Sequence, residues 1–173
     1  MKVVADFFIY NSHQPIFCYS SVVVKKTVFE NAGYFDETIT LGEDVDFNIR
    51  ANFHYSLAYY NRVCARYNIF SENQITNSSI AGKSITDFNK YEFLARGKPS
   101  VKLYLDINRY ILAMHYKLSG DNTAFRKLVS EIDNKNLSSK QILLLQSPVF
   151  IVKWLRKIKN LFLKKGIRFT SFK

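Results

Sequence analysis

Short apolar runs separated by polar residues characterise the first 80 positions. Four of these runs are rich in β-branched and aromatic residues: 16–19, 21–24, 57–60 and 63–67. Such runs predict short strands. Residues 25–32 have a helical pattern instead, and Gly33 is typical of a residue that ends a helix. The mixture predicts an α/β fold for this part of the chain, with a short mixed sheet and helices.

A longer helix is predicted at 43–54, where apolar residues recur on one face: Val45, Ile49 and Phe53. Its first turn contains Glu43, Asp44 and Asp46, at the end where the helix dipole stabilises carboxylates. Asp46 and Arg50 are four positions apart, which predicts an exposed ion pair worth about 0.3–0.5 kcal/mol. Taken alone, this acidic turn indicates helix stabilisation more readily than catalysis.

Only helical patterns follow a polar, Ser- and Asn-rich stretch at 71–86, which itself predicts a loop. One of the helices has an apolar stripe at spacings of three and four: Leu103, Ile107, Tyr110, Ile111, Met114 and Leu118. Residues typical of helix boundaries separate the segments: Asp87, Gly120, Ser138 with Gln141, and Pro148. The predicted division is an α/β part at 1–80, a helical extension at 81–147 and a tail helix at 148–173.

The net charge of +11 is concentrated in the tail, because no acidic residue follows Asp133 whereas ten of the 25 Lys and Arg residues do. In the last helix the apolar residues share one face: Ile151, Trp154, Leu155, Ile158, Leu161 and Phe162. Basic residues cover the rest of its surface. An aromatic-rich apolar face beside a cationic face predicts an interfacial membrane helix at 148–173. The alternative is an ordinary helix that packs on the domain and keeps its charges in water.

The composition fits a globular chain with a real core. The 173 residues are 47% hydrophobic and 16% aromatic, which excludes intrinsic disorder and allows one domain. Cys18 and Cys64 match no metal or redox spacing, and so few cysteines suit a reducing cytosol. Asp6 interrupts any signal-peptide pattern, and no apolar run reaches the roughly 18 residues that indicate a membrane span.

Two strings at a fixed spacing carry a resemblance to a known family. Residues 20–37 read SSVVVKKTVFENAGYFDE, and residues 42–50 read GEDVDFNIR. Together they resemble family 2 glycosyltransferases of the GT-A fold, the kind that build bacterial capsules and surface polysaccharides. The family pattern is a small-residue strand, a basic pair, a "vFe..GgFDE" turn and then "gED.d...R". Either string alone is a weak signal, whereas the combination is specific over 16–76, about a third of the chain.

The resemblance implies that the chain is the acceptor-side half of a GT-A fold, followed by an all-helical C-terminal appendage. It assigns catalysis to the acidic pair at the head of the 43–54 helix. Sugar transfer with inversion needs a base that takes the proton of the attacking acceptor hydroxyl. The resemblance gives this role to Asp44, with Glu43 as the runner-up, more suited to orienting the acceptor or a loop amide.

Five further residues are implied as substrate-binding candidates: Tyr19, Ser20, Ser21, Arg50 and Arg66. Each has a competing structural interpretation. The two serines fit packing positions on the expected strand, and Tyr19 fits core filling as well as stacking on a sugar. Arg50 can face a diphosphate or pair with a carboxylate of Asp36, Glu37 or Asp46. Arg66 is the nearest basic residue where the family often has a basic side chain or histidine and this chain has Asn68 and Phe70.

Asp44, Val45 and Asp46 match the D-x-D sequence with which the family usually holds its metal. That interpretation is rejected here, because the family's metal motif ends a strand in the nucleotide-binding half. On a helix, moreover, residues two apart point about 200° away from each other and cannot easily clasp one ion. No metal site is therefore predicted in this chain.

The family's nucleotide-binding half has no counterpart before residue 16. The expectation is a glycosyltransferase fragment that is inactive alone. In the full-length enzyme, Mg or Mn, a nucleotide-sugar donor and a glycan or lipid-linked acceptor are expected. The expected location is the cytoplasm, peripheral at the inner membrane face through 148–173.

Two other function classes compete with the enzyme. A non-catalytic membrane-docking or assembly module derived from a glycosyltransferase would tolerate Asp44→Asn. Nucleic-acid binding is suggested by the pI of about 9.6 and the many aromatic residues. The charge is confined to one tail and no recognised binding motif is present, so nucleic acid is not predicted as a partner.

Overall fold

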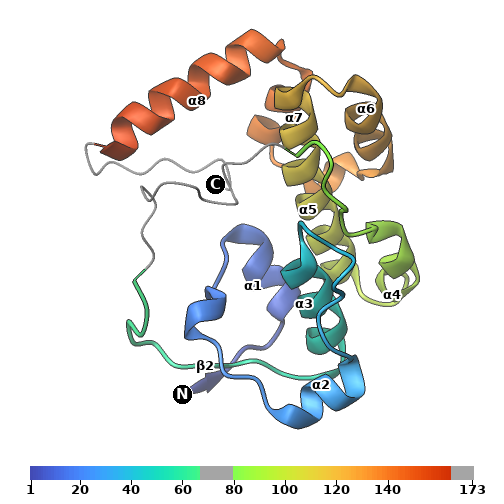
Figure 1. The fold of residues 1–173 in the computed structure, drawn as a ribbon, viewed down its shortest axis with the longest axis vertical. Coiled ribbons are helices and arrows are strands. Elements are labelled where there is room, and N and C mark those ends of the chain that lie inside the picture. Colours follow the sequence, from blue (N-terminus) through green and yellow to red (C-terminus); the bar gives the residue numbers. More distant parts are fainter. Residues whose placement is uncertain (67–79, 165–173) are drawn as a thin grey trace. The chain divides into compact units, whose positions relative to one another are not determined.

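The computed structural model describes residues 1–66 and 80–164, which form a mostly helical fold with one two-stranded sheet (Figure 1). The chain divides into two compact units, Met1–Tyr104 and Leu105–Lys173. The boundary between them lies within α5 (Pro99–Ser119). The predicted α/β class is confirmed only at this coarse level, and the three-part division at residues 80 and 147 stays a prediction.

The sheet of the first unit joins the beginning of the chain to residues 57–59. β1 (Lys2–Val3) pairs antiparallel with β2 (Ala58–Tyr59), so that Lys2 lies opposite Tyr59 and Val3 opposite Ala58. The ladder continues through a hydrogen bond of 2.8 Å from Val4 N to the Leu57 carbonyl. The strand predicted at 57–60 is therefore confirmed.

The strands predicted at 16–19 and 21–24 are wrong, because this stretch contains the 3₁₀ turn η1 (Tyr19–Ser21) instead. Ser21 donates both its backbone N–H and its hydroxyl to the Cys18 carbonyl, at 2.9 and 2.8 Å. Such local bonds from serine compete with strand pairing. Val23 is 99% exposed, as a core-facing strand residue would not be. The described part of the run at 63–67 also contains no strand, and Tyr67 lies outside the described residues.

α1 (Phe7–His13) has no counterpart among the predicted elements. Asp6 caps it, since its Oδ1 accepts hydrogen bonds from Phe8 N at 2.9 Å and from Ile9 N at 3.3 Å. The rings of Phe7 and Phe8 are buried and meet Tyr104 edge-on, with centroids 5.8 and 5.5 Å away. At seven residues the helix is too short for its hydrophobic period to stand out.

α2 (Lys26–Ala32) and α3 (Glu43–His54) confirm the two predicted helices. Gly33 ends α2 at a φ of +81°, a left-handed conformation that glycine adopts without strain. α3 is buried over a wider surface than the predicted stripe, because Phe47, Ile49 and Ala51 are its buried apolar residues. Phe47 joins α3 to the preceding segment through close ring contacts with Phe29 and Phe35, at 5.0 and 4.7 Å between centroids.

Residues 80–86 lie beside the segment that precedes α3 and are hydrogen-bonded to it. The backbone N–H groups of Thr40 and Leu41 both donate to the Ser84 carbonyl, at 2.9 and 3.1 Å. Leu41 and Ile85 form an isolated parallel bridge. The described part of the 71–86 stretch is thus irregular, as predicted, but anchored. η3 (Phe88–Tyr91) and α4 (Glu92–Ala95) follow, with Asp87 capping η3.

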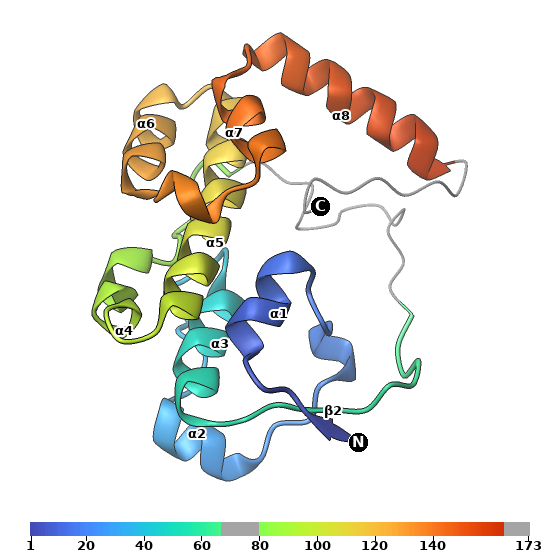
Figure 2. The same ribbon diagram turned by 180° about the vertical axis from the view of Figure 1, so that it is seen from behind.

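The described part of the second unit is helical, and its α-helices match the predicted segments. The 3₁₀ turn η4 (Asn134–Asn136), which Asp133 caps, has no predicted counterpart. α5 ends before Gly120, and α6 (Asn122–Glu131), α7 (Ser139–Gln146) and α8 (Val149–Lys164) follow (Figures 1 and 2). The capping box of Ser138 and Gln141 is confirmed, with both reciprocal bonds formed. A buried cation, Lys117, donates to the carbonyls of Leu144 and Leu145 at 2.9 and 2.5 Å and so satisfies the end of α7.

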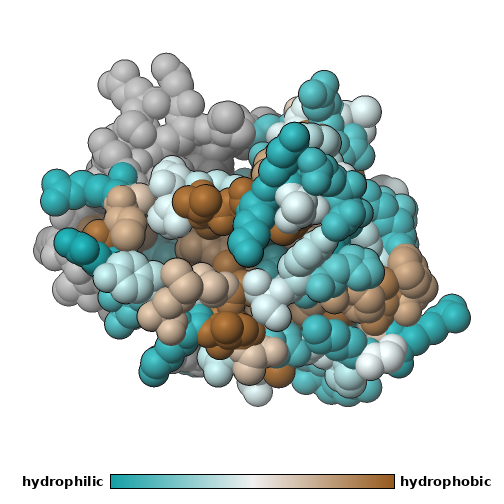
Figure 3. Space-filling view, turned by 90° about the horizontal axis from the view of Figure 1, so that it is seen from below, coloured by the Kyte–Doolittle hydropathy of each residue, from teal (hydrophilic) through white to brown (hydrophobic). Residues whose placement is uncertain are grey.

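In the view from below, hydrophobic and hydrophilic residues are interspersed on the surface (Figure 3). Among the described residues, no helix is both long and apolar enough to cross a membrane. Cys18 and Cys64 are exposed and form no disulfide with each other.

Candidate functional site

The acidic pair lies at the first turn of α3, whose start is held by the 80–86 segment. Gly42 precedes the helix at a φ of +89°, and its carbonyl accepts a hydrogen bond of 2.7 Å from the Thr86 hydroxyl. A Cβ at Gly42 would approach the Thr86 Oγ1 to 3.1 Å, so a side chain there would meet both backbone strain and crowding. Glu43 and Asp44 follow, both half-buried.

Few interactions offset the desolvation of the half-buried Asp44 carboxylate. Its Oδ1 accepts a hydrogen bond of 2.8 Å from Val45 N, and within the described residues no cation forms an ion pair with it. Burial raises the pKa of Asp44 and the neighbouring Glu43 charge adds to the rise, whereas the Val45 bond opposes it. A carboxylate with a raised pKa is a better proton acceptor than an ordinary surface aspartate.

Tyr19 joins η1 to α3 through its hydroxyl. The hydroxyl donates to the Asn48 side-chain oxygen at 2.8 Å and lies 3.3 Å from the Asp44 carbonyl. Burial, followed by the negative charge of Asp44, raises the pKa of Tyr19 well above its ordinary value. The phenol therefore stays protonated and remains a donor at neutral pH. Its ring meets Phe17 and Phe35 edge-on, at 5.7 Å in each case, which favours the core-filling interpretation.

The remaining candidates of the first segment are more loosely placed. Ser20 and Ser21 belong to the same turn as Tyr19 and both are exposed. They lie on a turn rather than on the expected strand, and the hydrogen bonds of Ser21 go to Cys18. Arg66 is exposed in the irregular segment after β2, and among the described residues no hydrogen bond or ion pair links it to Asp44.

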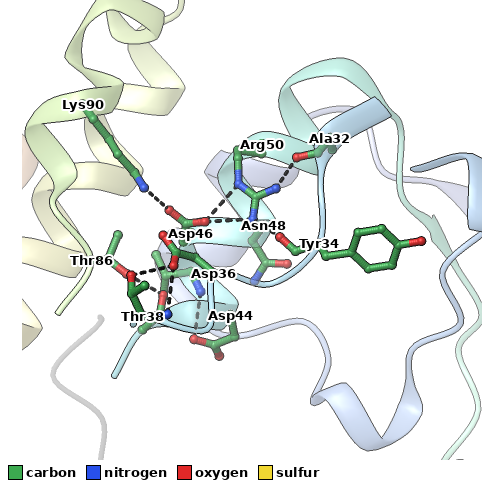
Figure 4. Close-up of polar contacts among 12 residues, drawn as sticks. Ala32, Tyr34, Asp36, Thr38, Asp44, Asp46, Asn48, Arg50, Thr86 and Lys90 are labelled. Atoms are coloured by element: carbon green, nitrogen blue, oxygen red, sulfur yellow. Dashed lines mark hydrogen bonds and ion pairs between the residues drawn. The ribbon is translucent and has the colours of Figure 1, made fainter. Parts of the chain in front are cut away.

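Asp46 is the centre of a buried ionic network, which corrects the prediction of an exposed helix pair. Its side chain is 1% exposed. The Arg50 Nε and Nη2 atoms both lie 2.9 Å from Oδ2, and Lys90 Nζ lies 2.5 Å from Oδ1 (Figure 4). The Tyr91 hydroxyl donates to Oδ1 at 2.6 Å. The network therefore links α3 to η3 and is not an exposed ion pair within one helix.

Arg50 uses its remaining donors on backbone carbonyls. It donates to the carbonyl of Ala32, at the end of α2, and to that of Tyr34 at 2.8 Å. A Cβ at Gly33 would come within 3.1 Å of Arg50 Nη1, so the glycine leaves room for the guanidinium. Of the three carboxylates considered as partners, Asp46 is the one that pairs. Asp36 instead accepts hydrogen bonds from the Thr38 backbone and hydroxyl, at 3.0 and 2.6 Å.

The pKa values of Asp44 and Asp46, the two aspartates of the first turn, are shifted in opposite directions. Burial raises the pKa of Asp46, but hydrogen bonds from Lys90, Tyr91 and Arg50 outweigh it and hold the pKa below its usual value. Asp44, two residues earlier, has no such donor side chains among the described residues, and burial raises its pKa. The same helix end thus presents a structural carboxylate with a lowered pKa and a second carboxylate that is more basic.

The D-x-D sequence does not form a metal clasp in this structure. The carboxylates of Asp44 and Asp46 point to different sides of the helix (Figure 4). The Asp46 oxygens are already occupied by three donor side chains. Within residues 1–66 and 80–164, no group of three or more His, Cys, Asp or Glu side chains could hold a metal ion.

Sequence reasoning missed Lys90 and Tyr91, the partners that η3 contributes. Tyr91 is 45 positions from Asp46, and no periodicity links the two. The sequence around Asp46 and Lys90 likewise does not indicate that these two side chains form an ion pair.

Comparisons of the chain with protein-family models, with curated proteins and with solved structures found no match.

Proposed function

We propose that the first turn of α3 is the acceptor-activating part of an inverting glycosyltransferase, with Asp44 as the general base. The observation that carries this proposal is the contrast in partners: Arg50, Lys90 and Tyr91 bond to Asp46, whereas the half-buried Asp44 accepts a hydrogen bond from Val45 N and pairs with no cation among the described residues. Where neighbouring acids have their pKa values pushed apart, the environments distinguish their roles. Asp46 is held ionised by three donors, whereas Asp44 has the raised pKa that a proton acceptor requires.

The proposed step moves one proton and exchanges one bond. The acceptor hydroxyl gives its proton to the Asp44 carboxylate while its oxygen forms a bond to the anomeric carbon of the donor sugar. The bond from that carbon to the nucleoside diphosphate breaks, and the diphosphate leaves with the electron pair. Attack from the face opposite the leaving group inverts the configuration.

Other residues of the site would position the base. Glu43 is half-buried beside Asp44 and would accept a hydrogen bond from the acceptor sugar. Tyr19 holds the first turn of α3 through Asn48 and the Asp44 backbone, so its hydroxyl would act on position rather than on the proton. The donor nucleotide and its Mg or Mn ion would be held by the nucleotide-binding half that the resemblance to glycosyltransferases implies.

The test is sugar incorporation in the cells that make this protein. Asp44→Asn, introduced at the chromosomal locus, is expected to reduce transfer of labelled sugar from nucleotide donors into lipid-linked or polymeric glycan by about 10²–10⁴-fold. Asp87→Asn is the matched control. Asp87 is exposed and caps η3, and Asn caps as well as Asp. The control variant is expected to keep wild-type incorporation.

The outcome that contradicts the proposal is full incorporation by an Asp44→Asn protein present at wild-type level. That result would favour a non-catalytic module that keeps a glycosyltransferase scaffold. Loss of incorporation in both variants would point to a folding defect, which circular dichroism of the purified chains detects.

A further inference from the structure

α8 has a stripe of large apolar side chains along one side, and most of them are exposed. Five large side chains on it are exposed to different extents: Phe150 is 71% exposed, Leu161 62%, Trp154 60%, Leu155 39% and Phe162 38%. At 100° per residue these positions fall within about 140° of the helix circumference, with Ile151 and Ile158 between them. An exposed apolar stripe of this length requires an explanation beyond the helix itself.

The buried contact of α8 lies on another side of the helix. Val152 is its buried residue, at 5% exposure. At 100° per residue it lies about 160° around the helix from Trp154. Within the stripe only Ile151 and Ile158 are half-buried, and its larger side chains stay exposed. This geometry disfavours the simplest alternative, in which the stripe is merely the inner face of an ordinary packed helix.

Outside the stripe, most of the exposed side chains of α8 are cationic. Lys153, Arg156, Lys157 and Lys159 are all exposed, and α8 contains no acidic residue. A second copy of this chain is a poor partner, because two such helices facing each other would bring like charges together. An anionic surface that also accepts apolar side chains satisfies both halves of the pattern.

We infer that α8 binds anionic lipid surfaces as an interfacial helix that lies in the plane of the membrane. Trp154 and Leu161 enter the boundary between headgroups and acyl chains, and the lysines and arginine lie at the level of the lipid phosphates. The helix is not of the kind that crosses a bilayer. This inference goes beyond the proposed function and does not depend on it, since no residue of α3 takes part.

The chain supplies its own probe, because Trp154 is its single tryptophan. The full chain is titrated with vesicles of phosphatidylglycerol and phosphatidylcholine, and separately with phosphatidylcholine alone. With the anionic vesicles we expect a blue shift of the tryptophan emission and quenching by lipids brominated on the acyl chains. Binding is expected to weaken as salt is added, because screening reduces the attraction between basic residues and anionic lipid.

Variants separate the two contributions. Lys153→Gln with Lys157→Gln is expected to lower the partition coefficient for anionic vesicles by about 25-fold, roughly fivefold for each charge. Leu161→Ser is expected to lower it by about tenfold while leaving Trp154 as the reporter. Phe93→Ser is the matched control. Phe93 is 63% exposed on α4, outside the proposed surface, so its loss should leave vesicle binding unchanged.

Three results would overturn the inference. The first is an emission spectrum that anionic vesicles do not shift. The second is equal binding by Leu161→Ser and the wild type. The third is a dimer, seen by light scattering without lipid, in which Trp154 emission is already blue-shifted and Leu161→Ser restores the monomer. Asp44→Asn should bind vesicles normally, so failure of this inference and failure of the proposed catalytic role are distinguishable.

Discussion

On the two sides of the first turn of α3, the pKa of a carboxylate depends more on its hydrogen-bond and ion-pair partners than on its position in the helix. Asp44 and Asp46 share one helix dipole and lie two residues apart. Asp46 is surrounded by Arg50, Lys90 and Tyr91 and stays ionised, whereas burial raises the pKa of Asp44. The dipole contributes only about 0.3–1 kcal/mol to either carboxylate, so direct donors outweigh it.

The largest effect is expected from removing the charge at the centre of the network. Asp46→Asn leaves Arg50 and Lys90 without their carboxylate and should lower the free energy of unfolding by about 3 kcal/mol. This is the low end for a broken buried pair, because Lys90 is 42% exposed and can be hydrated. Guanidinium denaturation of both proteins at pH 7 measures it. Asp36→Asn is the control with little expected effect, because Asp36 is half-buried, accepts its hydrogen bonds from Thr38, and Asn keeps an oxygen that can accept them. A loss for Asp46→Asn no larger than that of the control would contradict the network.

A smaller loss is expected from Tyr91→Phe, which removes one neutral donor and keeps the ring. A hydrogen bond to a charged group is worth about 2 kcal/mol, and Tyr91 is buried, so water cannot replace the donor easily. The loss should fall to about half in the Asp46→Asn background, since the amide oxygen of Asn still accepts the Tyr91 hydroxyl but carries no charge. Denaturation of the two single variants and the double variant forms the cycle that checks this. Additive losses would mean that the Tyr91 hydroxyl contributes independently of the charge on Asp46.

The smallest effect is expected on the other side of the helix, and its sign is opposite. Asp44→Asn removes an ionised carboxylate that burial disfavours, so it should raise the free energy of unfolding at pH 7 by a fraction of a kcal/mol. Because the folded pKa of Asp44 lies above its ordinary 3.8, the wild type loses stability as pH rises from about 3.8 through the folded pKa. The gain of the variant should therefore grow over that window and then level off.

Thermal unfolding from pH 3 to pH 7 compares the two sides directly. Asp46 has a lowered pKa, so its stabilisation is present above about 3.8 and is lost as pH falls through its folded pKa. The difference between Asp46→Asn and the wild type should accordingly shrink at the acid end, as the difference for Asp44→Asn also does. An Asp44→Asn variant that is less stable than the wild type at pH 7 would remove the basis for distinguishing the two acids.

Local patterns predicted most of the helices because their signals lie within a few residues. The capping box at Ser138 and the glycine at 33 mark helix ends through bonds to neighbouring backbone groups. The same reasoning failed for the stretch around Tyr19, where β-branched and aromatic residues predicted strands. There the bonds from Ser21 to the Cys18 carbonyl and from Tyr19 to α3 favour a turn, and the second of these depends on a segment 29 positions away.

The sequence by itself determined that an acidic turn opens α3, that helices follow residue 87 and that the tail is cationic on one face and apolar on the other. Only the tertiary structure decided which acid is paired. Tyr91, 45 positions from Asp46, meets it because the bonds of Thr40, Leu41 and Gly42 with Ser84 and Thr86 bring the two segments together. It also decided that the apolar side of α8 is exposed. Pairing and exposure depend on which distant segments become neighbours, and local periodicity carries no information about that.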